Sequence, residues 1–325
     1  MRLESQILIA VLLDLLVGDP RWLPHPVRAI AWLALRLEAV ARRACPFSLR
    51  LAGVFTAFGV YVATGAAAWG AIQLAGCAHP LAGDVVSILL IYTAVAAGDL
   101  AKHSRAVLLP LVHGNLPEAR RRVAAIVGRD TERLDAEGVV RAAVESVAES
   151  TVDGVTAPLF FAALGGPVGA IVYRAVNTLD SLFGHRDEQY AEFGWAAARI
   201  DDAANYLPAR ITAPLMCLTA LVLRLRAGQA VRIWRRDGRK HESPNSGLTE
   251  AAMAGALGVQ LGGLNYYDGQ PALKPTLGDP LTPLAPRHIT AANRLMFGTL
   301  ALFIAALLLA RLGVVTCWHL WRAAA

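Results

Sequence analysis

The feature that most constrains the fold is a long uncharged run from Leu51 to Gly83. It contains no Asp, Glu, Lys or Arg, and it exceeds the roughly 20 residues that a helix needs to cross a bilayer. Of the whole chain, 55% of the residues are hydrophobic and only 17% are charged, which is more apolar than an ordinary soluble domain. The sequence therefore predicts an all-α, polytopic integral membrane protein.

Shorter apolar runs with charged flanks follow the first one. Hydropathy alone leaves open whether they are tilted spans, short spans or helices buried against protein. One of them is interrupted at Gly165, Gly166 and Pro167, which would break a continuous helix. Non-helical backbone at membrane depth requires cover by protein or a cavity, so we expect re-entrant or buried central helices. The shorter runs are Val85–Gly98, Gly154–Tyr173, Ile211–Leu223 and Leu295–Ala310.

The basic residues indicate a topology. Arg21–Arg50, Lys102–Arg141 and the segment 224–240 are rich in Arg and Lys, whereas the link Gly76–Asp84 has none. By the positive-inside rule, the basic segments are cytoplasmic and the link is outside. An even number of crossings must then separate the last two basic segments, so the two central apolar runs either both span or neither fully spans. Because the arginines flank apolar runs, topology is favoured over nucleic-acid binding.

Other features bear on organisation. The run Ile7–Val17 is interrupted by Asp14 and lacks a small-residue cleavage site, so it is predicted to be a retained helix rather than a removed signal. The four widely spaced cysteines argue against a zinc site or a disulfide framework. Without repeats or a clear linker, residues 1–325 are predicted to form a single domain. Two local expectations are a helix N-cap at Asp130 and Thr131 and a turn-rich loop at Asn265–Pro275.

An acidic series provides the first candidate site. Glu145, Glu149 and Asp153 are spaced four apart, which places them on one helix face with Arg141 one turn earlier. Three acids in a row repel one another unless a cation relieves them, and magnesium bound by a few carboxylates together with substrate phosphates is one solution. A solvated stripe with an Arg141–Glu145 ion pair fits the spacing equally well.

A second cluster lies in ARIDDAANYLPAR, which ends at Arg210. Its arginines suit bidentate bonds to phosphate or carboxylate oxygens, and its acids and amide suit a metal. An ion network that holds membrane helices together is the alternative. The arginines are Arg199, Arg210 and the earlier Arg174, and the metal candidates are Asp201, Asp202 and Asn205.

Two further polar stretches are candidates. NTLDSLFGHRDEQY offers Asn177 and Asp180, and the turn before a later helix offers His241, Ser243 and Asn245. Backbone N–H groups at a helix start can bind an anion, although capping alone would explain Ser243 and Asn245. No GxxxxGK[ST], GxGxxG, GxSxG or HExxH motif is present. The residues alone thus leave a membrane enzyme or a transporter, and the long extramembrane polar motifs favour an enzyme.

Taken together, the motifs resemble the cobinamide-phosphate synthase family, CbiB or CobD, of the late cobalamin pathway, nearly from end to end. Two departures are Ser150, where the family usually has Asn, and Leu248–Thr249, where it usually has an aromatic residue and Pro. The motifs that carry the resemblance are GDPRWLPHPV, GRDTERLD, RAAVESVAESTVDGVTAPLFFAALGG, AVNTLDSLFGHRDEQYAEFGWAAARIDDAANYLPARITA and HESPNSGLTEAAMAGALGVQLGG.

The resemblance implies a multi-pass enzyme of the cytoplasmic (inner) membrane. It would join adenosylcobyric acid to aminopropanol or aminopropanol phosphate with ATP and Mg²⁺, giving adenosylcobinamide or its phosphate. It also implies contact with the lipid bilayer and association with other late-pathway membrane enzymes. Cytoplasmic substrates favour the option in which the central pair of runs does not fully span. The rival function is a corrinoid transporter or a scaffold for corrinoid-modifying enzymes.

Roles follow from the resemblance as hypotheses, and the side chains are expected to converge on one polar cavity. A carboxylate is a poor acyl donor, so activation as an acyl phosphate is expected before the amine attacks, with a base that keeps the amine neutral. The expected catalytic residues are Glu145, Glu149, Asp153, Asp201 and Asp202, with Glu149, Asp153 and Asp202 as metal ligands. The expected substrate-binding residues are Asn177, Asp180, Arg199, Asn205, Arg210, His241, Ser243 and Asn245.

Overall fold

The computed structural model describes residues 1–20, 22, 25–185 and 187–324, without the side chains of residue 312 and residues 314–324. Within this part the regular secondary structure is helical apart from one two-stranded sheet, which confirms the predicted all-α class. Parts of the sequence discussed above lie outside the described residues, namely Arg21, Leu23, Pro24, Arg186 and the side chain of Cys317.

The chain forms two compact units, each built from two segments. Unit 1 comprises Met1–Asp99 and Asp153–Pro208, and unit 2 comprises Leu100–Val152 and Ala209–Ala325. The prediction of a single domain stays a prediction, and each unit is described by itself.

Unit 1 is a helical unit in which α2, α3, α4 and α9 pack against α8 or α3. Its buried centre includes Val60, Leu179, Phe183 and Phe193. The turn at His79 joins α3 to α4, and the His79 side chain accepts the N–H of Leu81. The helices are α1 (Leu3–Val17), α2 (Pro26–Ala44), α3 (Leu49–Ala78), α4 (Pro80–Ala94), the start of α5 (Ala97–Val112), α8 (Ala157–Phe183) and α9 (Trp195–Ala204).

Asp14 explains why an acid interrupts the apolar helix α1. The chain leaves helical geometry between α4 and α5, and the carboxylate of Asp14 accepts the N–H of Gly98 at 3.0 Å. The N–H of Ala96 donates to the carbonyl of Gly154 at 2.8 Å. Asp14 is 1% exposed, so it satisfies a helix start that water does not reach.

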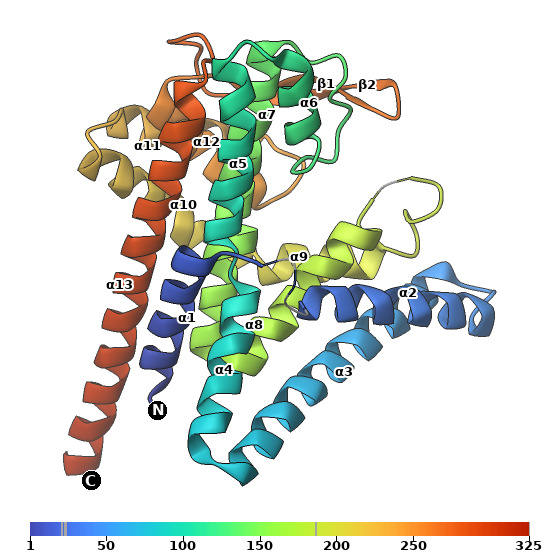
Figure 1. Cartoon of the computed structure of the whole chain (residues 1–325), viewed down its shortest axis with the longest axis vertical. Helices are drawn as coiled ribbons and strands as arrows, with labels where there is room; N and C mark the ends of the chain where they lie inside the picture. Colours follow the sequence, from blue (N-terminus) through green and yellow to red (C-terminus); the bar gives the residue numbers. More distant parts are fainter. Residues whose placement is uncertain (21, 23–24, 186, 325) are drawn as a thin grey trace. The chain divides into compact units, whose positions relative to one another are not determined.

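The glycines at 165 and 166 break the central helix as predicted. Gly166 has φ +62° and ψ −154°, inside the stretch assigned to α8. The rings of Phe161 and Tyr173 stack with centroids 5.0 Å apart. Twelve residues of straight helix would separate them by roughly 18 Å, so the chain folds back at Gly166 into a helical hairpin (Figure 1). Tyr173 is 2% exposed, which confirms buried central helices.

Four helical stretches within the described residues are long and apolar enough to cross a membrane. The protein is therefore a multi-pass membrane protein. A π-helix, Thr151–Thr156, joins α7 to α8 and lies within the third stretch. The four stretches are Leu49–Ala78, Pro80–Val112, Ala136–Phe183 and Arg287–Arg311.

Unit 2 is organised around α12, in which every residue from Ser246 to Leu257 is buried. Its alanines and glycines allow close packing; a Cβ on Gly255 would lie 2.6 Å from the carbonyl oxygen of Gln229 in α11. The elements are the rest of α5, α6 (Leu116–Val123), α7 (Ala136–Ser150), α10 (Tyr206–Val222) from Ala209 on, α11 (Ala227–Asp237), α12 (Ser246–Leu257), β1 (Leu261–Tyr267), β2 (Gln270–Leu277) and α13 (Arg287–Ala324).

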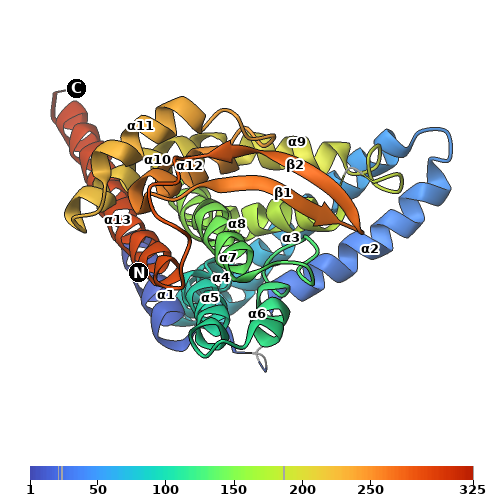
Figure 2. The ribbon, with the colours of Figure 1, turned by 90° about the horizontal axis from the view of Figure 1, so that it is seen from above.

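The predicted loop at Asn265–Pro275 is instead part of a β-hairpin. β1 and β2 pair antiparallel, and the turn residues Asp268 and Gly269 have φ of +49° and +77°. Positive φ at both central positions is the geometry of a type I′ turn, for which Asp-Gly is a strong signal. Figure 2 shows the two strands running side by side next to α12 and α7; β1 packs against both helices and β2 packs against α12.

The predicted N-cap at Asp130 and Thr131 is wrong. Asp135 caps α7, because its carboxylate accepts the N–H of Gly138 at 2.7 Å. The carboxylate of Asp130 accepts the N–H of Gly269 at 2.7 Å, and its own N–H donates to the carbonyl of Tyr266. Asp130 is therefore bound to the hairpin, which spacing within its own segment does not reveal.

We expect Gly53→Ala to destabilise the protein and Gly70→Ala, in the same helix, to leave it unchanged or slightly more stable. A Cβ on Gly53 would collide with the carbonyl oxygen of Phe193, whereas one on Gly70 meets nothing within 4 Å. Overpacking costs about 1–3 kcal/mol, and Ala is the better helix former at an open position. Thermal unfolding in detergent measures both; equal melting temperatures for the two variants would contradict the close packing.

Candidate functional site

Helix α7 of unit 2 carries Glu145 and Glu149 one turn apart and gives them different surroundings. Glu145 is 9% exposed, whereas Glu149 is exposed. The intervening residues Ser146, Val147 and Ala148 are buried against the rest of the unit. Two of the three predicted acids thus share a face of α7 and differ in burial, whereas Asp153 lies in the π-helix Thr151–Thr156 and belongs to unit 1.

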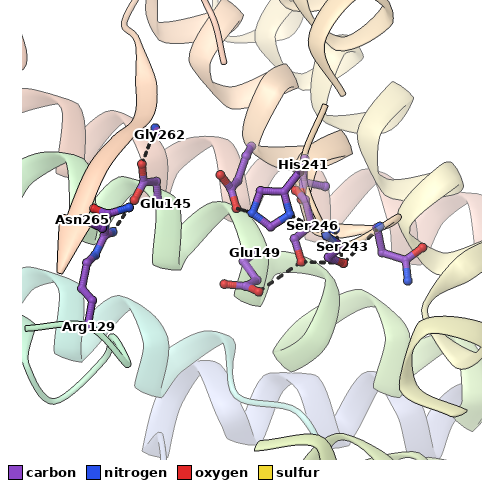
Figure 3. Close-up of polar contacts among 11 residues, drawn as sticks. Arg129, Glu145, Glu149, His241, Ser243, Ser246, Gly262 and Asn265 are labelled. Carbon is purple, nitrogen blue, oxygen red and sulfur yellow. Dashed lines mark hydrogen bonds and ion pairs between the residues drawn. The ribbon is translucent and has the colours of Figure 1, made fainter. Parts of the chain in front are cut away.

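Both carboxylate oxygens of Glu145 are bound by the protein. One accepts the N–H of Gly262 at 2.6 Å, and the other forms an ion pair with Arg129 (Figure 3). The side chains of Arg129 and Glu145 are only 7% and 12% exposed. Arg129 also donates to the amide oxygen of Asn265. Glu145 therefore links the segment before α7 to strand β1.

Arg141 does not form the ion pair with Glu145 that the spacing allows. Its guanidinium donates instead to the carbonyl of Leu264 at 2.8 Å and to the amide oxygen of Asn265 at 3.2 Å. Two arginines thus meet at one side chain of β1, and a single acid, Glu145, lies among them.

A second group of contacts surrounds Glu149. The Ser246 hydroxyl donates to Glu149 Oε1 at 3.1 Å and lies 3.2 Å from the Ser243 hydroxyl (Figure 3). Ser243 Oγ accepts the N–H groups of Asn245 and Ser246, both at 3.3 Å. Capping therefore accounts for Ser243. It does not account for the side chain of Asn245, whose amide oxygen accepts from Arg210 at 3.2 Å.

His241 is oriented by the same turn. Its Nδ1 accepts the N–H of Ser243 at 3.0 Å, so the neutral ring carries its proton on Nε2. That nitrogen lies 3.7 Å from Oε1 of Glu250. A Cβ on Gly247 would lie 2.5 Å from Cβ of His241, so the helix start must approach the ring closely. Glycine at this position therefore allows His241 to pack closely against the start of α12.

Burial sets the charge states of this pair. Burial raises the pKa of Glu250 well above its ordinary value, and the neighbouring Glu145 and Glu149 raise it further. Burial lowers the pKa of His241, and the positive charge of Lys274 adds to this. Both groups are therefore shifted toward their neutral forms. Burial opposes the charge of Lys274, yet its hydrogen bond with Tyr267 and the nearby carboxylates raise its pKa overall.

These contacts define a cluster that can bind charged groups and exchange a proton. Its members are Arg129, Arg141, Glu145, Glu149, His241, Ser243, Ser246, Glu250, Asn265 and Lys274. Glu145 is neutralised by Arg129 and Glu250 favours its neutral form, so Glu149 is the exposed acid of the cluster. Within the described residues, no group of three or more His, Cys, Asp or Glu side chains is arranged to hold a metal ion. A metal here would need ligands from a substrate or from water.

The remaining predicted residues belong to unit 1, where some of them form a buried network. The Tyr173 hydroxyl lies 2.8 Å from the amide oxygen of Asn205 and 3.3 Å from the carbonyl of Asp153. Asn205 in turn donates to Asp201 at 2.9 Å. Arg199, by contrast, is exposed. Asp201 and Asn205 thus join α9 to the central hairpin through Tyr173.

The predicted convergence of all site residues on one cavity stays a prediction, as do the individual roles. In unit 1, Arg174 donates to Asn177 at 3.5 Å, and the carbonyl of Asp180 accepts the N–H of Gly184. Unit 2 holds Glu145, Glu149, Arg210, His241, Ser243 and Asn245, and unit 1 holds Asp153, Asn177, Asp180, Arg199, Asp201, Asp202 and Asn205.

Six residues of the cluster were not among the predicted site residues, namely Arg129, Arg141, Ser246, Glu250, Asn265 and Lys274. Arg129 lies inside the GRDTERLD motif, and Glu250 is the one acid in the apolar helix α12, which is a usable signal for function. Asn265 and Lys274 lie in the segment that was predicted to be a loop. Their roles depend on strand register, in which Lys274 pairs with Gly263.

Comparisons with known proteins match nearly the whole chain to related sequences. A family model described as "CobD/Cbib protein" matches residues 7–296. "Cobalamin biosynthesis protein CobD" of Geobacter metallireducens is 54% identical over 298 residues, covering 92% of this chain and 93% of that protein. The CobD protein of Leptospira interrogans is 49% identical over 290 residues, covering 89% and 92%. "Cobalamin biosynthesis protein CbiB" of Salmonella arizonae is 45% identical over 304 residues, covering 92% and 95%. No solved structure matches the chain.

We expect Glu250→Gln to become increasingly more stable than the wild type as the pH rises above 4.5, the ordinary pKa of Glu. The raised pKa means that the folded protein keeps this proton while the unfolded chain releases it. Wild-type stability is thus lost as the pH rises toward the folded-state pKa, and Gln has no such proton. Unfolding measured from pH 4 to 8 tests this; a constant difference between the two proteins would contradict a raised pKa.

Proposed function

The chain belongs to the CobD/CbiB family of cobalamin biosynthesis proteins, and we propose that it is an adenosylcobinamide-phosphate synthase. A role in cobalamin biosynthesis follows from the family; the reaction itself is our proposal. In this reaction the free carboxylate of adenosylcobyric acid forms an amide with aminopropanol or its phosphate, driven by ATP. We place the enzyme in the cytoplasmic membrane, where these substrates are accessible, and expect contact with other late-pathway membrane enzymes there.

The reaction sets clear chemical requirements. A carboxylate oxygen of the corrinoid attacks the terminal phosphoryl group of ATP and releases ADP. The ammonium form of the amine first loses one proton and becomes the nucleophile. The neutral amine then forms the C–N bond, and inorganic phosphate leaves and takes up the second proton lost from nitrogen. The protein must therefore bind oxyanions, orient an amine and accept a proton.

The observation that carries the proposal is the charge distribution around α7 in unit 2. Glu149 is exposed and bound by Ser246, while Arg129 neutralises Glu145 and burial favours neutral Glu250. A positively charged amine is therefore attracted to Glu149, which can accept the proton that the amine must lose. Lys274 and the arginines of the cluster supply positive charge for phosphate and carboxylate oxygens.

Magnesium is proposed to enter with ATP, because phosphates and water supply most of its ligands and one or two protein carboxylates suffice. Bound in this way, it would offset phosphate charge. With Glu149 as proton acceptor, Asp153 and Asp202 are the remaining predicted metal ligands.

We expect Glu149→Gln to lower ATP-dependent amide formation by about 10²-fold or more, because Gln cannot accept a proton. The assay follows adenosylcobinamide or its phosphate formed by the purified full-length protein. Glu137→Gln, at an exposed position of the same helix, is the matched control and should keep wild-type turnover. Asp202→Asn tests the unit 1 residues in parallel.

Wild-type turnover in both Glu149→Gln and Asp202→Asn would reject the site assignment. Accumulation of corrinoid in sealed vesicles without formation of an amide would instead reject the ligase and favour a transporter.

A further inference from the structure

The amide of Asn265 has one orientation that its neighbours permit. Its Oδ1 receives hydrogen bonds from Arg129 and Arg141, and a guanidinium is only a donor. The other amide atom must therefore be the Nδ2 donor. Asn265 is 1% exposed, and its Nδ2 is buried without a hydrogen-bond partner among the described residues. A buried donor left unpaired costs about 1–3 kcal/mol, so this position calls for an acceptor.

Arg141 presents a second donor of the same kind. Its Nη2 is bonded to Leu264 and Asn265, while its Nε is buried and unpartnered in the described part of the chain. Gly263 lets the guanidinium approach the strand, because a Cβ there would lie 3.3 Å from Nη1. Two unsatisfied donors thus belong to side chains that contact each other directly.

The local charge also favours an anion. The two guanidinium groups of Arg129 and Arg141 are opposed by a single carboxylate, Glu145, which is occupied by Arg129 and by the N–H of Gly262. One positive charge therefore remains uncompensated within this contact network. Acceptor oxygens with negative charge match both the donors and the charge.

We propose that Arg129, Arg141 and Asn265 form an oxyanion-binding subsite at strand β1 of unit 2, which takes a phosphoryl or carboxylate group. This inference deepens the proposed function, since each of its substrates other than unphosphorylated aminopropanol carries such a group. Nδ2 of Asn265 and Nε of Arg141 donate to the bound oxygens, and the bond from Arg129 to Oδ1 holds Asn265 in the orientation that leaves Nδ2 as the unpaired donor.

Asn265→Asp tests the subsite with a minimal change of shape. One carboxylate oxygen can still accept from Arg129 and Arg141, so the fold should be retained, whereas the second replaces the donor by a negative charge. We expect the affinity for inorganic phosphate, followed by ³¹P NMR on the purified full-length protein, to fall roughly ten- to a hundredfold. Asn115→Asp places the same charge at the N-cap of α6, where a carboxylate is suitable, and should bind phosphate normally.

Arg141→Lys is the second variant, since it keeps the charge and removes Nε; it too should bind phosphate at least tenfold more weakly. Phosphate binding by Asn265→Asp and Arg141→Lys equal to that of the wild type would overturn the subsite. If Asn265→Asp does not fold, Arg141→Lys decides alone.

Competition identifies the source of the oxyanion. Aminopropanol phosphate, ATP and adenosylcobyric acid are each added to the phosphate-bound protein. Aminopropanol, which has neither a phosphoryl nor a carboxylate group, is the control. Displacement by one of the three assigns the subsite to that substrate, and displacement by none overturns its assignment to a substrate. Asn265-dependent phosphate binding by a protein that forms no amide would reject the proposed function while the oxyanion subsite stands.

Discussion

The buried ion pair between Arg129 and Glu145 is the interaction on which the organisation of unit 2 depends. It joins the segment before α7, the helix itself and, through Asn265 and Gly262, strand β1. Removing one partner of such a pair typically costs about 3–5 kcal/mol, because the other charge remains buried. The pair therefore fixes where the hairpin lies against α7, and with it the position of every polar group on β1.

The same pair shapes the chemistry of the cluster. Once Arg129 has neutralised Glu145 and burial has favoured neutral Glu250, the acids on α7 and α12 no longer act as one repelling group. Glu149 is left as the exposed carboxylate, beside a hydroxyl pair and an oriented histidine. The turn of α7 at Glu145 therefore lies beside arginines, and the next turn carries the exposed carboxylate of Glu149. An amide-forming enzyme needs both, one for oxyanions and one for an amine.

Much of the fold can be predicted from the sequence. Uncharged runs indicate the spanning helices, and the Gly-Gly-Pro sequence indicates the break at Gly166, because both are local properties. The hairpin could also have been found from Asp268-Gly269, but its flanks contain too many turn-forming residues for clear alternation. At the site, spacing alone placed Glu145 and Glu149 on one face. It could not identify their partners, since Asn265 lies 136 residues from Arg129 and meets it only through strand register.

The most direct test of this account is a double-mutant cycle between Arg129→Met and Glu145→Gln, with the free energy of unfolding measured in detergent. If this ion pair holds the hairpin against α7, each single variant loses about 3 kcal/mol or more of unfolding free energy. The double variant then loses little more than either single variant, which gives a coupling energy of at least about 2 kcal/mol. Additive losses, with no coupling between the two positions, would contradict it.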